Sequence, residues 1–549
     1  MSASRERKER ANYKSDAQPQ KQEKKKVSEG LIFFISIMAI LIAVFGTIIG
    51  IKYYQRNQTV MVVGDKEISA REFNYFFNQT ASNYGDYASY LGIDTTTTID
   101  TQKVASENVS MMSLLGMDID VLAPYKQETQ NEDGTTTATY DITWAGYFAL
   151  LAKKTAAQTW AVYQEAEKAG YQIPEEIETS IQNELLNADF YAQIYGMDTD
   201  AFLDAQYGDG CNRENYEQHL RVSYVASDFA SNYWFSDADI EAKYTESAAD
   251  FDVVTFKAYS VSSSEFLSTE ETAETEEGEE TEQTEQTEEE KAAAEAEAKA
   301  QAKAAAEAME ASFDETDDAV STYADYNLES AKTYITEEAG TWLFETAQIG
   351  DVKLFANEDG TTYYVVKLLA NDVNYLASNF LQIYMAAEEE TTEEDHEGHD
   401  HEEGEEATEE ETELTVAEKV ETILASLAED GSEENFRTLA TSYNGDASVD
   451  LEDVANAYLE NYIGTEALEW SMAGQEAGAY EVFENTNGTY ILYYLGTSEH
   501  TYRNLSVNSA LVSEWIENLT TTAVENCKFD MAAAMNASVA LTLQANSEY

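Results

Sequence analysis

Histidine and cysteine, the side chains that most often bind metals or act as nucleophiles, are scarce in this sequence. The chain has five histidines and two cysteines among 549 residues. Three of the histidines, His396, His399 and His401, stand close together among carboxylates, and such a group could hold Zn²⁺ or Ca²⁺ weakly. The alternative is a solvated run of charge, because nothing in the sequence fixes the geometry of the ligands. No cofactor is expected.

Other motifs that carry chemistry are missing. Two cysteines exclude a disulfide scaffold and a cysteine-rich zinc module. The sequence has no Gly-x4-Gly-Lys-Ser/Thr phosphate loop and no Gly-x-Ser-x-Gly nucleophile elbow. Against 32 Lys and Arg stand 106 Asp and Glu, a formal net charge of −74. This charge excludes a protein that binds the phosphate backbone of nucleic acids.

The charge changes sign at one apolar segment near the N-terminus. Residues 1–30 carry nine Lys and Arg against five Asp and Glu, whereas the remaining chain carries 23 against 101. Between them, residues 31–51 form an uncharged run of 21 residues, long enough to cross about 30 Å of hydrocarbon as a helix. A cleaved signal peptide would have a shorter apolar region, of about 7–15 residues. We therefore expect an uncleaved anchor over 31–52.

The lysines before this anchor predict its orientation. Lys24, Lys25 and Lys26 precede the apolar run and favour a cytoplasmic N-terminus. Residues 1–30 are then a cytoplasmic tail, and everything after the anchor lies outside the membrane. The expected location is a cell membrane that the chain crosses once.

The first segment beyond the anchor has the pattern of a mostly helical domain. Residues 60–73 predict a short strand, a Gly-Asp turn and a helix opened by a capping box between Ser69 and Glu72. From 144 to 169 large apolar residues recur at helical spacing, and Gly170 supplies the C-cap. These patterns predict helices through most of residues 57–250.

The order of several short motifs resembles the PrsA-like foldases and SurA-like chaperones. The motifs are Ile-Ser-x-x-Glu-Phe at 68–73, the helix end at 163–170, and Ser-Asp-x-Asp-Ile-x-x-x-Tyr at 236–244, which leads into an apolar β-type run. The resemblance implies an α+β chain with a single transmembrane helix, a mainly helical SurA-N-like chaperone core and two tandem parvulin-like α+β domains. The implied ranges are the core at 53–250, the parvulin-like domains at 251–371 and 372–496, and a C-terminal segment at 497–549 that packs back on the core.

An internal repeat supports two copies of one domain. Trp342, Gly350 and Gly360 recur as Trp470, Gly478 and Gly488, at an offset of 128. Each copy starts with a β-type run and ends with another, which suits an α+β unit of about 120 residues.

Parvulin domains isomerise X–Pro bonds. The resemblance implies a site with one histidine on the first strand of the domain and one on its final strand. The expected first strands, at 255–259 and 380–384, contain no histidine, and Thr362 and Tyr490 stand where the final-strand histidine is expected. We therefore expect degenerate domains with no catalytic residue. An apolar pocket could still bind substrate through Phe355 and Phe483, or these two rings belong to the core.

Each copy carries an acidic insert at an equivalent place. Residues 265–290 hold 13 acidic residues and residues 388–413 hold 16, with few hydrophobic ones, which predicts disordered loops. Helical patterns follow the inserts, at 288–310 and at 416–427.

The expected function is a membrane-anchored foldase or chaperone that assists secreted proteins outside a bacterial cell of the Gram-positive type, with unfolded secreted polypeptides as partners. Two alternatives stay open: an active prolyl isomerase and a cation-binding envelope scaffold. If the C-terminal segment packs on the core as the resemblance implies, Cys211 and Cys527 could be bridged; two free thiols are the competing interpretation. The sequence does not decide the oligomeric state.

Overall fold

The computed structural model describes residue 47 and residues 50–130, 136–267, 288–387, 414–445 and 447–537. The chain is of the α+β class and divides into two compact units. We call Met1–Tyr233 with Trp515–Tyr549 the helical unit, and Trp234–Glu514 the sheet unit. Most of the expected anchor at 31–52 lies outside the described residues. Among the residues that are described, no helix combines the length and apolarity needed to span a bilayer.

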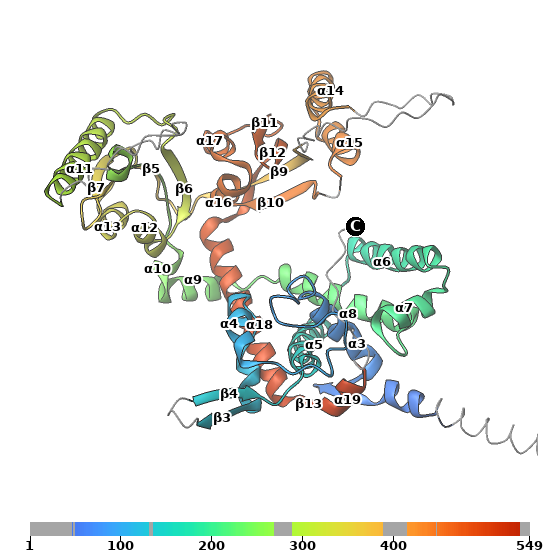
Figure 1. Ribbon diagram of the computed structural model, residues 1–549. Coiled ribbons are helices and arrows are strands. Elements are labelled where there is room, and N and C mark those ends of the chain that lie inside the picture. Colours follow the sequence, from blue (N-terminus) through green and yellow to red (C-terminus); the bar gives the residue numbers. More distant parts are fainter. Residues whose placement is uncertain are drawn as a thin grey trace, which may run out of the picture. The chain divides into compact units, whose positions relative to one another are not determined.

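The helical unit is built mainly from helices of the N-terminal half (Figure 1). Its elements are β1 Thr59–Val63, β2 Lys66–Ser69, α3 Ala70–Ser82, η1 Ser106–Asn108, α4 Val109–Leu114, η2 Asp120–Tyr125, β3 Lys126–Gln130, β4 Thr136–Tyr140, α5 Trp144–Ala169, α6 Glu175–Ile194, α7 Thr199–Tyr207, α8 Arg213–Ser231, β13 Lys528–Phe529 and α19 Met531–Ala537.

Local signals explain where these helices begin and end. Ser69 and Glu72 form the predicted capping box at the start of α3. The hydroxyl of Thr143 caps α5, and Gly170 ends it with a φ of 69°, a left-handed conformation that glycine adopts without strain. The buried faces of α3 and α5 carry many of the large side chains of the main core, including Phe73, Trp144 and Phe148.

The last described residues complete this unit. Strand β13 pairs with β1 through Met61 and Phe529, in a three-stranded sheet of order β13-β1-β2. Ala533 and Ala534 of α19 are buried in the same core as α3 and α5. Residues 528–537 therefore pack on the first strand and on the main core of this unit.

The expected boundaries of the helical core need correction. The core was expected to run to residue 250, with a C-terminal segment at 497–549 packing on it, but residues 234–250 and 497–514 belong to the sheet unit. The reason is a small apolar cluster in which Ile240 and Phe251 pack against Val507. This cluster holds helices α9 Asp237–Glu246 and α10 Ala248–Phe251 against the first half of α18 Tyr502–Asn526, whose second half belongs to the helical unit.

Two four-stranded antiparallel sheets form the rest of the sheet unit (Figure 1). The first sheet subdomain contains β5 Val254–Ser262, η3 Ser263–Phe266, α11 Glu288–Ala311, β6 Val320–Tyr326, α12 Leu328–Tyr334, α13 Glu337–Glu345, β7 Val352–Ala356 and β8 Thr362–Ala370. The second contains β9 Leu376–Ala386, α14 Val416–Glu429, α15 Glu433–Tyr443, β10 Asp450–Val454, α16 Asn456–Tyr458, η4 Leu459–Ile463, α17 Thr465–Met472, β11 Tyr480–Asn485 and β12 Gly488–Thr501.

The two subdomains share one plan. Their strand orders are β6-β5-β8-β7 and β10-β9-β12-β11, so the first strand of each pairs with the last. Helices cover both faces of each sheet: α11 lies opposite α12 and α13 in the first, and α14 and α15 lie opposite α17 in the second. Both sheets belong to one compact unit rather than to two separate domains. The helices predicted after the acidic inserts are α11 and α14, whereas residues 268–287 and 388–413 lie outside the described residues.

Candidate functional site

The central strand pairs of the two sheets do not present a pair of histidines. In the first sheet Lys257 of β5 faces Lys367 of β8, and in the second Leu381 of β9 faces Tyr493 of β12. His500 does lie on the final strand of the second sheet, because β12 continues through Thr501 past an irregularity at Tyr494 and Gly496.

His500 is far along β12 from that central pair. Its ring stacks on Trp234 with a centroid distance of 4.0 Å, and its backbone N–H donates to Ser498 Oγ at 2.9 Å. Strand β9, which β12 faces, contains no histidine. This arrangement gives His500 a packing contact and leaves it without a second histidine on the neighbouring strand.

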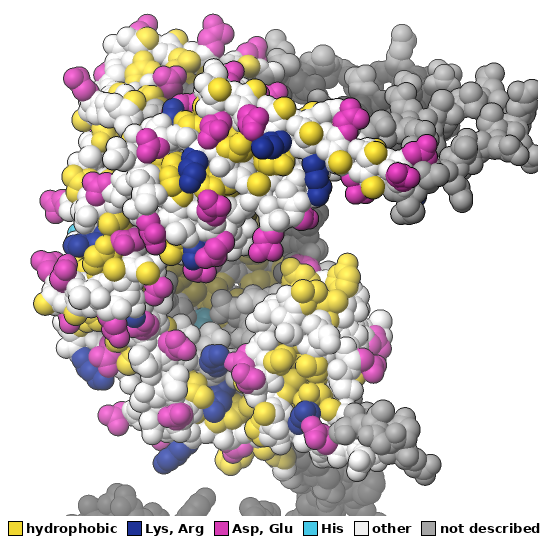
Figure 2. Space-filling view, turned by 90° about the vertical axis from the view of Figure 1, so that its left-hand side faces the viewer, with side chains coloured by type: hydrophobic (Ala, Val, Ile, Leu, Met, Phe, Trp, Pro, Cys, Tyr) yellow, Lys and Arg dark blue, Asp and Glu magenta, His cyan; other side chains and the backbone are white. Residues whose placement is uncertain are grey.

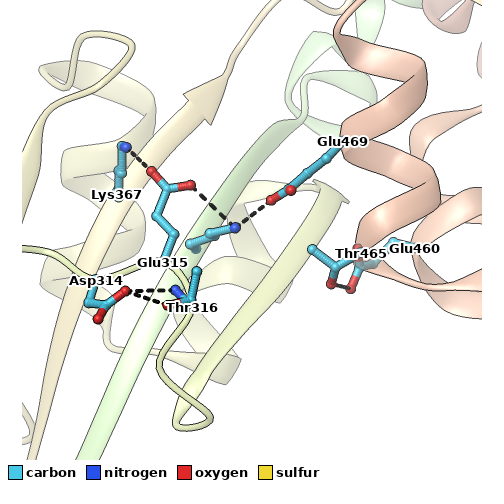
Figure 3. A network of polar contacts seen from close by, with 8 residues as sticks. Asp314, Glu315, Thr316, Lys367, Glu460, Thr465 and Glu469 are labelled. Carbon is cyan, nitrogen blue, oxygen red and sulfur yellow. Dashed lines mark hydrogen bonds and ion pairs between the residues drawn. The ribbon is translucent and has the colours of Figure 1, made fainter.

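The lysine pair of the first sheet belongs to a network of ion pairs (Figure 3). The Lys257 ammonium lies 2.5 Å from Glu469 Oε1 and 3.3 Å from Glu315 Oε2, and its side chain is 5 % exposed. Glu315 also pairs with Lys367. Burial opposes the charge of Lys257, but the two carboxylates outweigh it and raise its pKa. A lysine held charged in this way is a poor base, so the network joins the subdomains rather than supplying a proton acceptor.

Glu460, on the side of the second subdomain, lies close enough to Lys257 and Glu469 to feel their charges but makes a separate contact (Figure 3). It accepts a hydrogen bond from Thr465 Oγ1 at 2.9 Å, while its other carboxylate oxygen is buried without a partner. Burial raises the pKa of this carboxyl group. The ion pair between Lys257 on β5 and Glu469 on α17 joins residues that are 212 positions apart in the chain.

Phe355 and Phe483, the candidate substrate-binding rings, are core residues. Each is 4 % exposed, and they lie in the cores of the first and second subdomain. Phe355 packs on Trp342 at a centroid distance of 5.4 Å, and Phe483 packs on Trp470 at 5.7 Å. The repeated Trp and Phe positions of the sequence are thus a repeated packing contact.

The two cysteines are free thiols, so the disulfide alternative is not the arrangement found. Cys211 is buried among α6, α7 and α8, whereas Cys527 is half-buried beside the main core of the helical unit. His396, His399 and His401 lie outside the described residues. Over the ranges that the structure does describe, no three side chains of His, Cys, Asp or Glu are grouped to hold a metal ion.

Helix α6 exposes several large apolar side chains to solvent. Leu186, Phe190 and Ile194 recur at four-residue spacing along it and are 60 %, 59 % and 61 % exposed. We call these three side chains the apolar strip. The buried face of the same helix is formed by Ile181, Leu185, Ala188 and Ala192. A helix of a folded domain normally has one apolar face directed at the core, and α6 has a second one directed at solvent.

Beside the strip lies a groove of about 600 Å³ between α6, α7 and α8, which we call the aromatic groove. Its lining includes Tyr191 of α6, Tyr195 at the C-terminal end of α6, Phe202 and Tyr207 of α7, and Tyr216 of α8. Tyr195 stacks on Phe202 with ring centroids 6.0 Å apart and planes 15° apart. The volume lies within the range of about 300–1,000 Å³ that is usual for ligand pockets.

The surroundings of the groove are acidic. Glu184 lies on its wall. Burial raises the pKa of Tyr207 and Tyr216, and the negative charge of Glu184 raises both further. These phenols therefore stay neutral at physiological pH and can donate hydrogen bonds within an apolar wall.

Sequence reasoning did not single out this surface. The signal was present in the sequence. Leu186, Phe190 and Ile194 recur at four-residue spacing, and this stripe lies next to a second apolar stripe of α6 that includes Leu185. An aromatic stripe is more often core than binding surface, and only the packing of α7 and α8 decides which stripe is covered.

Comparisons with known proteins do not add a family. No protein-family model matches the chain, and no curated protein matches it.

Proposed function

We propose that this protein is a membrane-anchored foldase-like chaperone that holds non-native secreted polypeptides outside the cell. The observation that carries the proposal is the apolar strip of α6, with three large side chains about 60 % exposed beside an aromatic groove. A contiguous apolar surface on a folded protein costs free energy in water unless a partner covers it. Non-native chains supply such partners, because their apolar side chains are exposed.

The sheet unit supports a chaperone over an active isomerase. Catalysis of prolyl isomerisation must lower a barrier of about 20 kcal/mol. The facing central residues of the first sheet are two lysines held by carboxylates, and those of the second are Leu381 and Tyr493. Neither pair offers the two histidines that an active parvulin site is expected to have. We therefore propose that the two subdomains have lost catalysis.

The anchor belongs to the proposal on sequence grounds alone. Residues 31–51 are long and apolar enough to cross a bilayer, with three lysines just before them. A chaperone fixed to the outer face of the membrane would meet secreted chains as they emerge.

Two activities of the full chain, held in nanodiscs of zwitterionic lipid, test the proposal. We expect suppression of aggregation of a reduced, unfolded client at about equimolar ratio, and no acceleration of prolyl isomerisation in a tetrapeptide. Replacing the strip by Leu186→Ser/Phe190→Ser/Ile194→Ser should abolish most of the suppression. The matched control Tyr90→Ser/Leu114→Ser removes side chains that are 67 % and 79 % exposed elsewhere in the same unit, and should retain it.

Three results would contradict the proposal. Efficient isomerisation would favour the enzyme, and unimpaired suppression by the strip variant would place client binding elsewhere. Absence of both activities would favour a scaffold, which a titration with Ca²⁺ or Zn²⁺ would then examine.

A further inference from the structure

We infer that the apolar strip and the aromatic groove select one class of client segment: a short extended apolar stretch that contains an aromatic side chain and is flanked by Lys or Arg. This inference rests on the proposed function and names the substrate class of the same surface. It is carried by three independent features, which are the length of the strip, the lining of the groove and the charge around both.

The length of the strip limits the segment it can cover. Leu186 and Ile194 are eight residues apart on α6, which corresponds to about 12 Å at a rise of 1.5 Å per residue. An extended chain advances about 3.3 Å per residue, so roughly four residues cover the strip. Because successive side chains of an extended segment point to opposite sides, about two of them contact the strip at a time.

The groove favours an aromatic side chain among those that contact it. Its walls present the rings of Tyr191, Tyr195 and Phe202, which can pack against a planar ring by offset or edge-to-face contacts. Tyr216 donates its phenol proton to the Tyr207 oxygen, so the Tyr207 O–H is the phenol donor that can serve a backbone carbonyl of the bound segment. Tyr191 and Tyr195 flank both the strip and the groove, so one segment can contact the two surfaces together.

Charge determines what can flank the apolar stretch. Residues 175–212, which include α6 and α7, contain nine acidic residues and no Lys or Arg. The arginines that follow on α8 are already paired: Arg221 donates to Glu178 at 2.7 and 2.9 Å, and Arg213 lies 3.3 Å from Asp189. The surface around the strip is therefore negative, and basic flanks bring opposite charge to it.

The same charge argues against two other occupants. A second copy of this chain would bring a body of the same sign, since the whole sequence has a formal charge of −74. An anionic membrane surface would be repelled for the same reason. On the face drawn in Figure 2, hydrophobic side chains form separate groups, with both acidic and basic side chains between them.

Fluorescent peptides with one apolar core, such as Leu-Phe-Leu-Phe, test the inference on the full chain in nanodiscs. The core is flanked on both sides by Lys, by Gln or by Glu. At low ionic strength we expect the Lys-flanked peptide to bind about tenfold or more tighter than the Glu-flanked peptide, with the Gln-flanked peptide between them. Exposed charges are screened by salt, so this ratio should shrink several-fold at 0.5 M salt.

Variants locate the site. Leu186→Ser/Phe190→Ser/Ile194→Ser should weaken all three peptides by tenfold or more, and Glu184→Gln should weaken only the Lys-flanked one, by about two- to fivefold. The charge control Glu107→Gln removes an exposed carboxylate elsewhere in the same unit and should leave binding unchanged. Because the strip side chains are exposed, circular dichroism should show unaltered helix content in the triple variant.

The outcomes separate this inference from the proposed function. Equal binding of the Lys-flanked and Glu-flanked peptides, with client aggregation still suppressed, overturns the selectivity and leaves the chaperone in place. Full binding of all peptides by the strip variant overturns the site. A strip-dependent dimer in sedimentation, or strip-dependent binding to vesicles with anionic lipid, would assign the surface to a second copy or to a membrane instead.

Discussion

Asp325 and Asp453 occupy the same place in the two sheet subdomains, 128 residues apart, and each has a φ of 54°. Among the described residues other than glycine, these two alone have a positive φ. The backbone N–H of Asp325 donates to Thr255 on the first strand at 3.2 Å, and that of Asp453 donates to Asn379 at 2.8 Å. The repeat therefore extends from the Trp and Gly motifs of the sequence to an unusual backbone conformation near the end of each second strand.

The side chains of the two aspartates make different hydrogen bonds. Asp325 accepts hydrogen bonds from Tyr375 Oη and from the N–H of Ala457, both at 2.8 Å, which joins β6 to the second subdomain. Asp453 instead accepts from Ser498 within its own sheet. The two copies thus differ here, because the carboxylate of the first one contacts the second subdomain.

We predict that Asp325→Asn stabilises the sheet unit at neutral pH. Burial raises the pKa of the Asp325 carboxyl above its usual 3.8, so the stability it contributes is present below about pH 3.8 and is lost as the pH rises through the folded-state pKa. Asparagine keeps both acceptor contacts, tolerates the left-handed backbone and carries no charge. Urea unfolding at pH 7.5 and pH 4 should show a gain for the variant that shrinks at the lower pH.

The comparison variant Asp325→Ala should destabilise the sheet unit. It leaves the Tyr375 hydroxyl and the Ala457 N–H without their partner, at a cost of about 1–3 kcal/mol, and places alanine at an unfavourable φ. A loss for Asp325→Asn as large as that for Asp325→Ala at pH 7.5 would show that the negative charge itself holds the junction.

A second prediction concerns the lysine at the centre of the ion-pair network. Lys257 is nearly inaccessible to solvent, whereas the side chains of Glu315 and Glu469 are 37 % and 49 % exposed. The double variant Glu315→Gln/Glu469→Gln leaves a buried ammonium without a carboxylate, and we expect a loss of roughly 3 kcal/mol in the free energy of unfolding.

Removing the buried charge should reverse this loss. Adding Lys257→Met to the double variant should recover most of the stability, because an apolar side chain suits the buried position. Calorimetry of the three variants measures the effect. If the triple variant were no more stable than the double variant, Lys257 would be stabilised by groups other than the two carboxylates.

The sequence predicted the parts of this fold that local chemistry determines. The capping box of Ser69 and Glu72, the left-handed Gly170 and the alanine-rich helix α11 all follow from interactions within a few residues. The two sheets follow from apolar runs in a repeated order. The hairpin of β3 and β4 was missed, although the β-branched Thr136, Thr137 and Thr139 after an Asp-Gly pair were a signal for it.

Features that depend on distant contacts could not be predicted. The junction contact of Lys257 and Glu469 and the end of the helical core at Tyr233 arise from packing between segments far apart in the chain. The exposure of the apolar strip has the same origin, since only the positions of α7 and α8 decide which stripe of α6 is covered. For the same reason the sequence could not tell whether Phe355 and Phe483 line a pocket or fill a core.

A third prediction is a pH dependence from His219. Its ring stacks on Tyr75 at 4.9 Å and meets the edge of Phe76 at 4.8 Å, and burial lowers its pKa from 6.5 to about 4. The unfolded chain therefore binds a proton more readily, so the helical unit should lose stability as the pH falls from about 6.5 to about 4, by roughly 3 kcal/mol in total.

Hydrogen exchange of the α3 and α8 amides, corrected for intrinsic rates, measures this loss. His219→Phe should remove most of the pH dependence, while His500→Phe, in the other unit, should leave it in place. A pH dependence that survives His219→Phe would assign it to other groups of the helical unit.

The last prediction distinguishes the two thiols by their reactivity. The reactive form of cysteine is the thiolate, and burial raises the pKa of Cys211 to about 12, so its thiol stays protonated. Cys527 is half-buried, and its Sγ lies 3.2 Å from the carbonyl oxygen of Val524. Iodoacetamide at pH 8 should therefore label Cys527 in the native protein and both cysteines in urea. Cys527→Ser should abolish native labelling, and a Cys211–Cys527 disulfide peptide in a non-reducing digest would contradict the free thiols of the structure.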